Sequence, residues 1–207
     1  MQLLGFTFSL LALIVTSMPI GVILILMGIL MSLFWLPVDI FAVIGITTWE
    51  TATNDLLIAI PLFIMMGEIM LHSGSASSMY RALLPWLNRL PGSLMHTNIA
   101  ACSMFAATSG SSVATAATVG TIAIPEIEKR GFNERLFLGT LAAGGTLGTL
   151  IPPSINMIIY GAITKTSIPQ LYLAGFVPGL LLAVVFMATI ALLCTLRPDW
   201  GGEKVVA

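Results

Sequence analysis

The sequence predicts an all-α integral membrane protein, and its composition is the first reason. Of its 207 residues, 57% are hydrophobic and only 8% are charged, and the mean hydropathy is +1.03. A soluble domain carries about 25% charged residues because water must solvate its surface. Uncharged stretches near the length of about 20 residues that spans a bilayer are the second reason. The third is that one run rich in small and hydroxyl residues and one run rich in glycine and proline interrupt these stretches.

The same composition excludes several other classes of protein. A net charge of −1 gives no electrostatic reason to expect nucleic acid as a partner. With only His72 and His96 available, a multi-histidine metal site is not expected. Cys102 and Cys194 lie in apolar stretches and lack the spacing of a disulfide or zinc framework, so we expect them to be small apolar fillers. No resident cofactor is predicted.

The first part of the chain, residues 1–53, is predicted to hold N-terminal membrane helices and an interfacial helix. Residues 3–36 carry no charge and are too many for one ordinary span. This run lacks a basic leader and exceeds a signal-peptide core, so we expect it to stay in the membrane. Because Pro19 would remove a helix hydrogen bond, the run is either one kinked helix or two short helices joined by a tight turn. Residues 38–48 are apolar and predict the interfacial helix.

The next stretch contains a predicted span and a predicted loop. Leu56–Leu71 is apolar except for Glu68 and is long enough, with its flanks, to cross the membrane. Arg81 and Arg89 then flank a polar segment containing Pro85, which we predict to be a loop. Positive charge near the ends of spans marks the cytoplasmic side, so this loop is expected in the cytoplasm.

A re-entrant hairpin is predicted for residues 92–128. The 34 residues from 92 to 125 carry no charge, and the cations between residues 129 and 135 place their far end in the cytoplasm as well. Both ends then lie on one side, so the segment must enter and return. Two arms of about 15 residues would each reach roughly 22 Å. Small and hydroxyl residues at the centre favour close packing, and Ser109–Ser112 is the predicted turn.

A broken helix is predicted for residues 136–160, and a last span follows it. Three glycines and two prolines occur between Gly144 and Pro153, too many for a continuous helix, so we expect an unwound strip in this range. Residues 54–167 would thus combine a span, the hairpin and the broken helix. Residues 168–207 are predicted to form the last membrane span and a short cytoplasmic tail.

The two interruptions together predict a site for a sodium ion and an organic anion. Unwound carbonyls and hydroxyls can replace the hydration shell of sodium, and helix N-termini present N–H groups to a carboxylate. Neither interruption contains a charged residue, which would be costly at membrane depth. No catalytic residue is predicted. The candidate ion- and substrate-binding residues, without individual sodium ligands assigned, are Ser109, Gly110, Ser111, Ser112, Gly144, Gly145, Thr146, Gly148, Pro152, Pro153, Ser154 and Asn156.

Five segments resemble, in order along the chain, the DctM-type large permease subunit of tripartite ATP-independent periplasmic (TRAP) transporters. They are Leu57–Glu68, Ser109–Thr115, Ala123–Glu126, Ile151–Gly161 and Leu173–Leu181. The resemblance implies half of an inverted-repeat, elevator-type transporter of the ion transporter superfamily, with residues 1–53 scaffold-like and residues 54–167 transport-domain-like. It favours two short helices in residues 3–36 and a periplasmic N-terminus. Many members have Asp where this chain has Thr115.

The function that the resemblance implies is sodium symport of a small organic acid, such as a C4-dicarboxylate or sialic acid, across a bacterial or archaeal inner membrane. The implied partners are a small DctQ-type membrane subunit, a DctP-type periplasmic solute-binding protein and the C-terminal half of the permease, since the large subunit of the family is about twice this length. The chain is therefore expected to be a multi-pass membrane protein in contact with lipid, and not an enzyme.

Two alternatives remain open. The first is a secondary anion transporter of the same superfamily that works without a binding protein, which the neighbouring genes would distinguish. The second is an intramembrane serine protease that uses a serine of Ser109–Ser112 and His96. That chemistry requires the two groups within hydrogen-bond reach, whereas about twelve helical residues, roughly 18 Å, separate them. Asn98 is expected to hydrogen-bond between packed helices.

Overall fold

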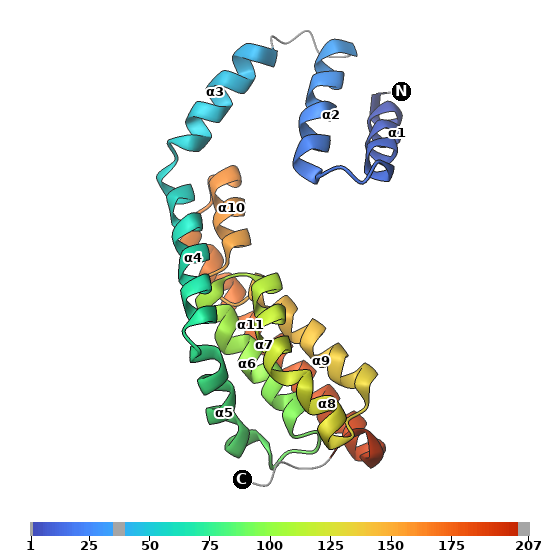
Figure 1. The fold of residues 1–207 in the computed structure, drawn as a ribbon. Helices are drawn as coiled ribbons and strands as arrows, with labels where there is room; N and C mark the ends of the chain where they lie inside the picture. The colour runs from blue at the N-terminus through green and yellow to red at the C-terminus, as the bar shows by residue number, and fades with distance from the viewer. Residues whose placement is uncertain (1, 35–39, 203–207) are drawn as a thin grey trace. The chain divides into compact units, whose positions relative to one another are not determined.

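The structure is a computed structural model that describes residues 2–34 and 40–202, and every regular element in these residues is a helix (Figure 1). The all-α prediction is therefore confirmed for the described part of the chain. The chain divides into two compact units, Met1–Asn54 and Asp55–Ala207. Each unit is described separately below. The division of the chain at residues 53 and 167 into scaffold-like, transport-domain-like and last-span parts remains a prediction.

The first unit contains α1 (Gln2–Val15), α2 (Ile20–Phe34) and α3 (Ile40–Ala52). The chain turns over Thr16–Pro19, and α1 and α2 pack against each other, so the structure has two short helices instead of one kinked helix. Pro19 directly precedes α2, where its missing N–H removes no helix hydrogen bond. The predicted interfacial helix overlaps α3, but residues 38 and 39 lie outside the described part.

The second unit holds a larger set of helices wrapped around one central helix. They are α4 (Asp55–His72), α5 (Ser75–Leu87), α6 (Leu94–Ser109), α7 (Ser112–Ala123), α8 (Pro125–Arg130), α9 (Glu134–Thr146), α10 (Ile155–Thr164) and α11 (Ile168–Leu196), with 3₁₀ turns η1 (Leu147–Thr149) and η2 (Pro198–Trp200). The central helix α6 contacts α4, α5, α7, α9 and α11, and most of its side chains are buried. Its small residues permit these close approaches.

Two of the described helices, α4 and α11, are long and apolar enough to cross a membrane. Further apolar helices, among them α2 and α10, are shorter. Large apolar side chains stand exposed along both long helices, for example Leu62 and Ile69 on α4 and Leu173 and Leu192 on α11. Exposed apolar surface of this extent is typical of a protein whose surroundings are lipid or another protein.

The predicted polar loop around Arg81 and Pro85 is wrong, because most of that segment forms helix α5. Apolar residues recur there at helical spacing, and two of them, Ala76 and Tyr80, are buried. Pro85 lies two residues before the end of α5, and its missing N–H removes one helix hydrogen bond, to the carbonyl oxygen of Arg81. Proline and arginine in this segment favour a loop, but the helical spacing of its apolar residues determines the structure.

Candidate functional site

The turn between α6 and α7 contains two capping residues, one at the C-terminus of α6 and one at the N-terminus of α7. Gly110 follows the last residue of α6 with φ of 62°, a left-handed conformation that suits glycine, and its N–H donates to the carbonyl oxygen of Ala106 at 2.9 Å. Ser111 is extended and caps α7, because its hydroxyl accepts a hydrogen bond from the Ala114 N–H at 3.3 Å. The sequence Ser-Gly-Ser-Ser thus produces a tight helical hairpin. We call Ser109–Ser112 the tip.

Hydroxyl groups are linked to one another behind the tip. The Thr115 hydroxyl donates to the Ser111 carbonyl oxygen at 2.6 Å and lies 3.2 Å from the Ser109 hydroxyl. The Ser111 N–H donates to the Ser109 hydroxyl at 3.4 Å. Ser109 and Thr115 are buried, so these bonds stabilise the tip from within. Thr115 therefore has a role in holding the turn.

The helix break lies between α9 and α10, and it is narrower than the predicted range. Helix α9 continues through Gly144, Gly145 and Thr146, η1 covers Leu147–Thr149, and residues 150–154 form no regular element before α10 begins. We call Leu150–Ser154 the break. Ser154 has the extended conformation of a helix cap, yet its buried hydroxyl has no hydrogen-bond partner among the described residues.

The tip and the break meet through their backbones. The Ile155 N–H donates to the Gly110 carbonyl oxygen at 3.2 Å. A Cβ atom added to Gly110 would lie 2.8 Å from the Pro153 carbonyl oxygen. A Cβ atom added to Gly148 would lie 2.8 Å from the Ser112 backbone nitrogen and 2.9 Å from the Ser111 carbonyl oxygen. Only glycine permits these approaches, so two predicted segments far apart in sequence form one place in the fold.

Gly144 and Gly145 serve helix packing instead of unwinding. A Cβ atom on Gly145 would lie 2.8 Å from the Ala116 Cβ, and one on Gly144 would lie 2.8 Å from the Cys102 Sγ. These glycines let α9 approach α7 and α6. Two other candidates are exposed to the surroundings. The Thr146 hydroxyl donates to the Ala143 carbonyl oxygen of its own helix, and Asn156 lies in the first turn of α10. Their binding roles stay predictions.

Three further glycines, which the sequence analysis did not single out as site residues, support the tip and the break. A Cβ atom on Gly67 of α4 would lie 3.3 Å from the Ser109 Cβ. On α11, a Cβ atom on Gly175 would lie 2.8 Å from the Leu150 carbonyl oxygen, and one on Gly179 would lie 3.1 Å from the Ile151 Cγ1. The spacing of four residues between Gly175 and Gly179 was the available signal, because it puts both on one helix face.

The chemistry of this place is neutral and rich in oxygen. Neither the tip nor the break contains an ionisable side chain. Within residues 2–34 and 40–202, no cluster of three or more His, Cys, Asp or Glu could hold a metal ion. His96 stands near the start of α6, where its Nε2 lies 2.8 Å from the Pro91 carbonyl oxygen, whereas Ser109 ends that helix. The geometry thus does not assemble a serine–histidine pair.

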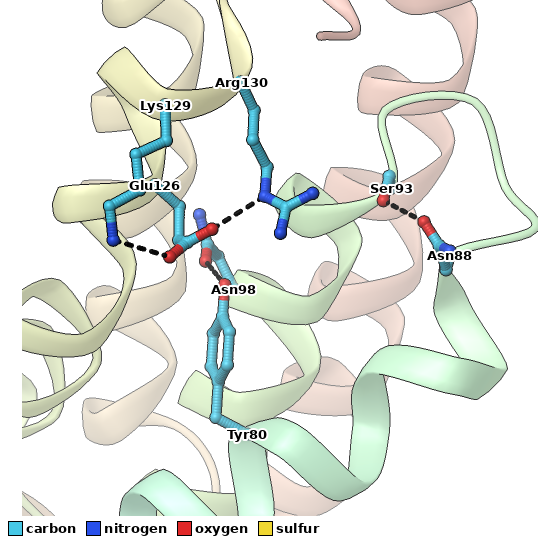
Figure 2. A network of polar contacts seen from close by, with 7 residues as sticks. All are labelled: Tyr80, Asn88, Ser93, Asn98, Glu126, Lys129 and Arg130. Carbon is cyan, nitrogen blue, oxygen red and sulfur yellow. Dashed lines mark hydrogen bonds and ion pairs between the residues drawn. The ribbon is translucent and has the colours of Figure 1, made fainter. Parts of the chain in front are cut away.

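A separate polar network joins helices near the other end of the hairpin (Figure 2). The Tyr80 hydroxyl donates to Asn98 Oδ1 at 2.8 Å. Asn98 Nδ2 in turn donates to the Thr140 hydroxyl at 3.0 Å, which links α5, α6 and α9. Asn98 therefore packs helices, as expected. On α8, Glu126 accepts a hydrogen bond from Arg130 Nε at 2.7 Å and lies 3.5 Å from Lys129 Nζ.

The comparisons with known proteins agree with the resemblance. The sequence model described as "Tripartite ATP-independent periplasmic transporter, DctM component" matches residues 7–205. The C4-dicarboxylate TRAP transporter large permease protein DctM of Pseudomonas aeruginosa is 39% identical over 154 residues, which cover 74% of this chain and 36% of that protein. Its counterpart in Rhodobacter capsulatus is 34% identical over 193 residues, covering 84% and 42%.

A relative with another substrate in its name is the sialic acid TRAP transporter large permease protein SiaM of Vibrio cholerae. It is 33% identical over 144 residues, covering 70% of this chain and 34% of that protein. The chain thus spans less than half the length of these curated relatives. All three are named as transporter permeases, and none as an enzyme. With nearly all of its residues matched by the family model, the chain belongs to the DctM family of TRAP transporter components.

Proposed function

We propose that this chain acts as the N-terminal half of a TRAP permease subunit that imports a small organic acid together with sodium. The observation that carries the proposal is the contact between the tip and the break, where the Ile155 N–H meets the Gly110 carbonyl oxygen at 3.2 Å. In secondary transporters, interrupted helices that meet in this way hold the coupling ion and the substrate. The proposed location is the inner membrane.

The proposed sodium site uses oxygen atoms on both sides of this contact. The Ser154 hydroxyl is fully buried and has no partner in the described part of the chain. Leaving such a group unsatisfied costs about 1–3 kcal/mol, which an ion bound to its oxygen would offset. The Gly110 carbonyl oxygen accepts one hydrogen bond and has a second lone pair. We propose that Ser154 and the tip contribute to sodium binding, with further ligands from Ser109–Ser112.

The proposed substrate site uses the ends of two helices. Helix α7 begins at Ser112 and α10 begins at Ile155, next to the contact between the tip and the break. The first turn of each helix has N–H groups without partners in its own helix, and both ends carry partial positive charge. Two such ends suit a carboxylate. Relatives named for C4-dicarboxylate, ectoine, sialic acid and isethionate show that substrates vary within the family, so we propose the class alone.

The proposed transport needs partners beyond this chain. We propose a DctQ-type small membrane subunit, a DctP-type periplasmic solute-binding protein that delivers the acid, and a C-terminal half that completes the permease. In carriers built from inverted repeats the substrate lies between the repeats, so one repeat alone would lack half of the site. An elevator movement of residues 54–167 against a scaffold that includes residues 1–53 is the proposed route across the membrane.

Uptake into proteoliposomes tests this function. The complete permease that contains these residues would be reconstituted with its small subunit, and the binding protein would be supplied outside with a labelled acid, starting with C4-dicarboxylates and sialic acid. We expect uptake only when a sodium gradient points inward and the binding protein is present. Equal uptake with potassium replacing sodium would contradict the coupling. Equal uptake without the binding protein would contradict the proposed dependence on that partner and favour a carrier that works alone.

A further inference from the structure

Helix α5 has two faces of opposite character. On the inner face Ala76 is buried, Tyr80 belongs to the core of the second unit, and Leu83 and Leu84 pack against that core. The outer face stands free of the unit, and its largest member, Trp86, has 81% of its surface exposed. One side of the helix therefore carries exposed residues, namely Ser78, Arg81, Ala82, Pro85, Trp86 and Arg89 immediately after the helix.

A side-chain hydrogen bond to α6 supports this orientation of α5, with its outer face away from the unit (Figure 2). The Tyr80 hydroxyl donates to Asn98 Oδ1 of α6 at 2.8 Å. Burial raises the pKa of Tyr80, so the phenol remains the neutral donor that this bond requires. Just beyond the end of α5, the Ser93 hydroxyl donates to Asn88 Oδ1 at 2.5 Å. Helix α5 is thus joined to α6 at its middle through Tyr80, and Asn88 just after its end is joined to Ser93 just before α6.

The chemistry of the outer face is basic and aromatic. Arg81 and Trp86 are exposed on α5, and Arg89 is exposed two residues after its end. Helix α5 contains no acidic residue. Neither guanidinium group forms a hydrogen bond or an ion pair with any described residue. Tryptophan is enriched at the membrane–water interface, and arginine is attracted by the negative surface of the cytoplasmic leaflet.

We infer that the outer face of α5 binds the headgroups of anionic phospholipids in the cytoplasmic leaflet. Two unpaired guanidinium groups complement lipid phosphates, and an exposed tryptophan beside them suits the interface, where its ring can contact the top of the acyl chains. A protein partner would bury more apolar area than this face offers, since Trp86 is the only large exposed apolar residue within α5. The inference rests on the proposed function in one respect, because the proposed topology of the permease places this face on the cytoplasmic side.

Tryptophan fluorescence tests the inference in the complete permease. The difference between the wild type and Trp86→Phe isolates the signal of Trp86 from that of all other tryptophans. The permease would be reconstituted into phosphatidylethanolamine vesicles that hold equal fractions of either brominated phosphatidylglycerol or brominated phosphatidylcholine. We expect the anionic lipid to quench the Trp86 signal at least about twofold more than the zwitterionic lipid at low salt. This ratio should fall as salt screens the charges.

Two variants make the result specific. Replacing both arginines, Arg81→Gln with Arg89→Gln, should bring the quenching ratio close to one, whereas Arg135→Gln, at an exposed arginine of α9, should leave it unchanged. Equal quenching by the two lipids in the wild type would overturn the inference, and so would an unchanged ratio in the double variant. Absence of quenching by either lipid would also overturn it, because Trp86 would then lie in water or against protein. Sodium-driven uptake is measured separately, so either proposal can fail alone.

Discussion

The Ile155 N–H donates a hydrogen bond to the Gly110 carbonyl oxygen at 3.2 Å, and this bond joins the two interruptions of the helical fold. Ile155 is the first residue of α10, and Gly110 ends α6 in a left-handed conformation. Their contact brings the N-termini of α7 and α10 to the same place. The proposed site therefore depends on backbone geometry more than on any charged side chain.

The first prediction concerns the fit of Gly148 against the tip. In the complete permease, Gly148→Ala should lower sodium-driven uptake by about tenfold or more, because its Cβ would lie 2.8–2.9 Å from the backbone of Ser111 and Ser112. Overpacking of this kind costs about 1–3 kcal/mol. Gly139→Ala is the matched control, since a Cβ atom there has nothing within 4 Å. Equal uptake by the two variants, at equal amounts in the membrane, would contradict the proposed tight contact.

A second prediction concerns the hydrogen bonds that join Tyr80, Asn98 and Thr140. Tyr80→Phe should lower the free energy of unfolding by about 1 kcal/mol, because it removes the buried hydrogen bond to Asn98. Asn98→Ala should cost more, since it also removes the bond to Thr140. The double variant should be less destabilised than the sum of the two single variants, because both lose the same bond. Strictly additive losses in detergent unfolding curves would show that the two side chains do not interact.

Topology provides a third prediction. Cysteines introduced as Arg89→Cys and Lys129→Cys should react with a membrane-impermeant thiol reagent only from the cytoplasmic side, and Thr166→Cys only from the periplasmic side. The reason is that positive charge flanks both ends of the hairpin, which must then enter and leave on one side. Cys102 and Cys194 are buried, so the unsubstituted chain provides the background. Labelling of positions 89 and 129 from opposite faces would eliminate the re-entrant hairpin.

Much of the helical organisation could be predicted from the sequence because glycine, proline and charge mark where helices end. The turn at Ser109–Ser112 and the interruption before α10 both follow from local backbone preferences. Two details differ for physical reasons. Gly144 and Gly145 remain helical because tertiary packing uses their missing side chains, and α5 tolerates Pro85 because only one hydrogen bond is lost.

The contact between the tip and the break could not be predicted from the sequence alone. It joins Gly110 to Ile155 and Gly148 to Ser112, and no local preference specifies such pairs. The same applies to the supporting glycines of α4 and α11, whose partners lie far away along the chain. Ser154 could be recognised as a candidate helix cap, but its unpartnered hydroxyl became evident only in the folded arrangement.

The sodium dependence of uptake by Ser154→Ala tests the central claim most directly. The Ser154 hydroxyl has no partner in the described part of the chain, so its removal should leave folding stability unchanged or slightly higher. If that oxygen binds sodium, the sodium concentration for half-maximal uptake should rise by about tenfold, which corresponds to about 1.4 kcal/mol. Thr118→Val is the control, because it removes another buried, unpartnered hydroxyl that lies outside the tip and the break.

The measurement is a sodium titration of uptake by the wild-type permease and by the two variants in proteoliposomes, beside unfolding curves for each. We expect a raised sodium requirement and intact stability for Ser154→Ala, and wild-type behaviour for Thr118→Val. An unchanged sodium requirement in Ser154→Ala would contradict a role for the break in sodium binding. An equal rise in both variants would show that loss of a buried hydroxyl acts on the fold instead of on the ion.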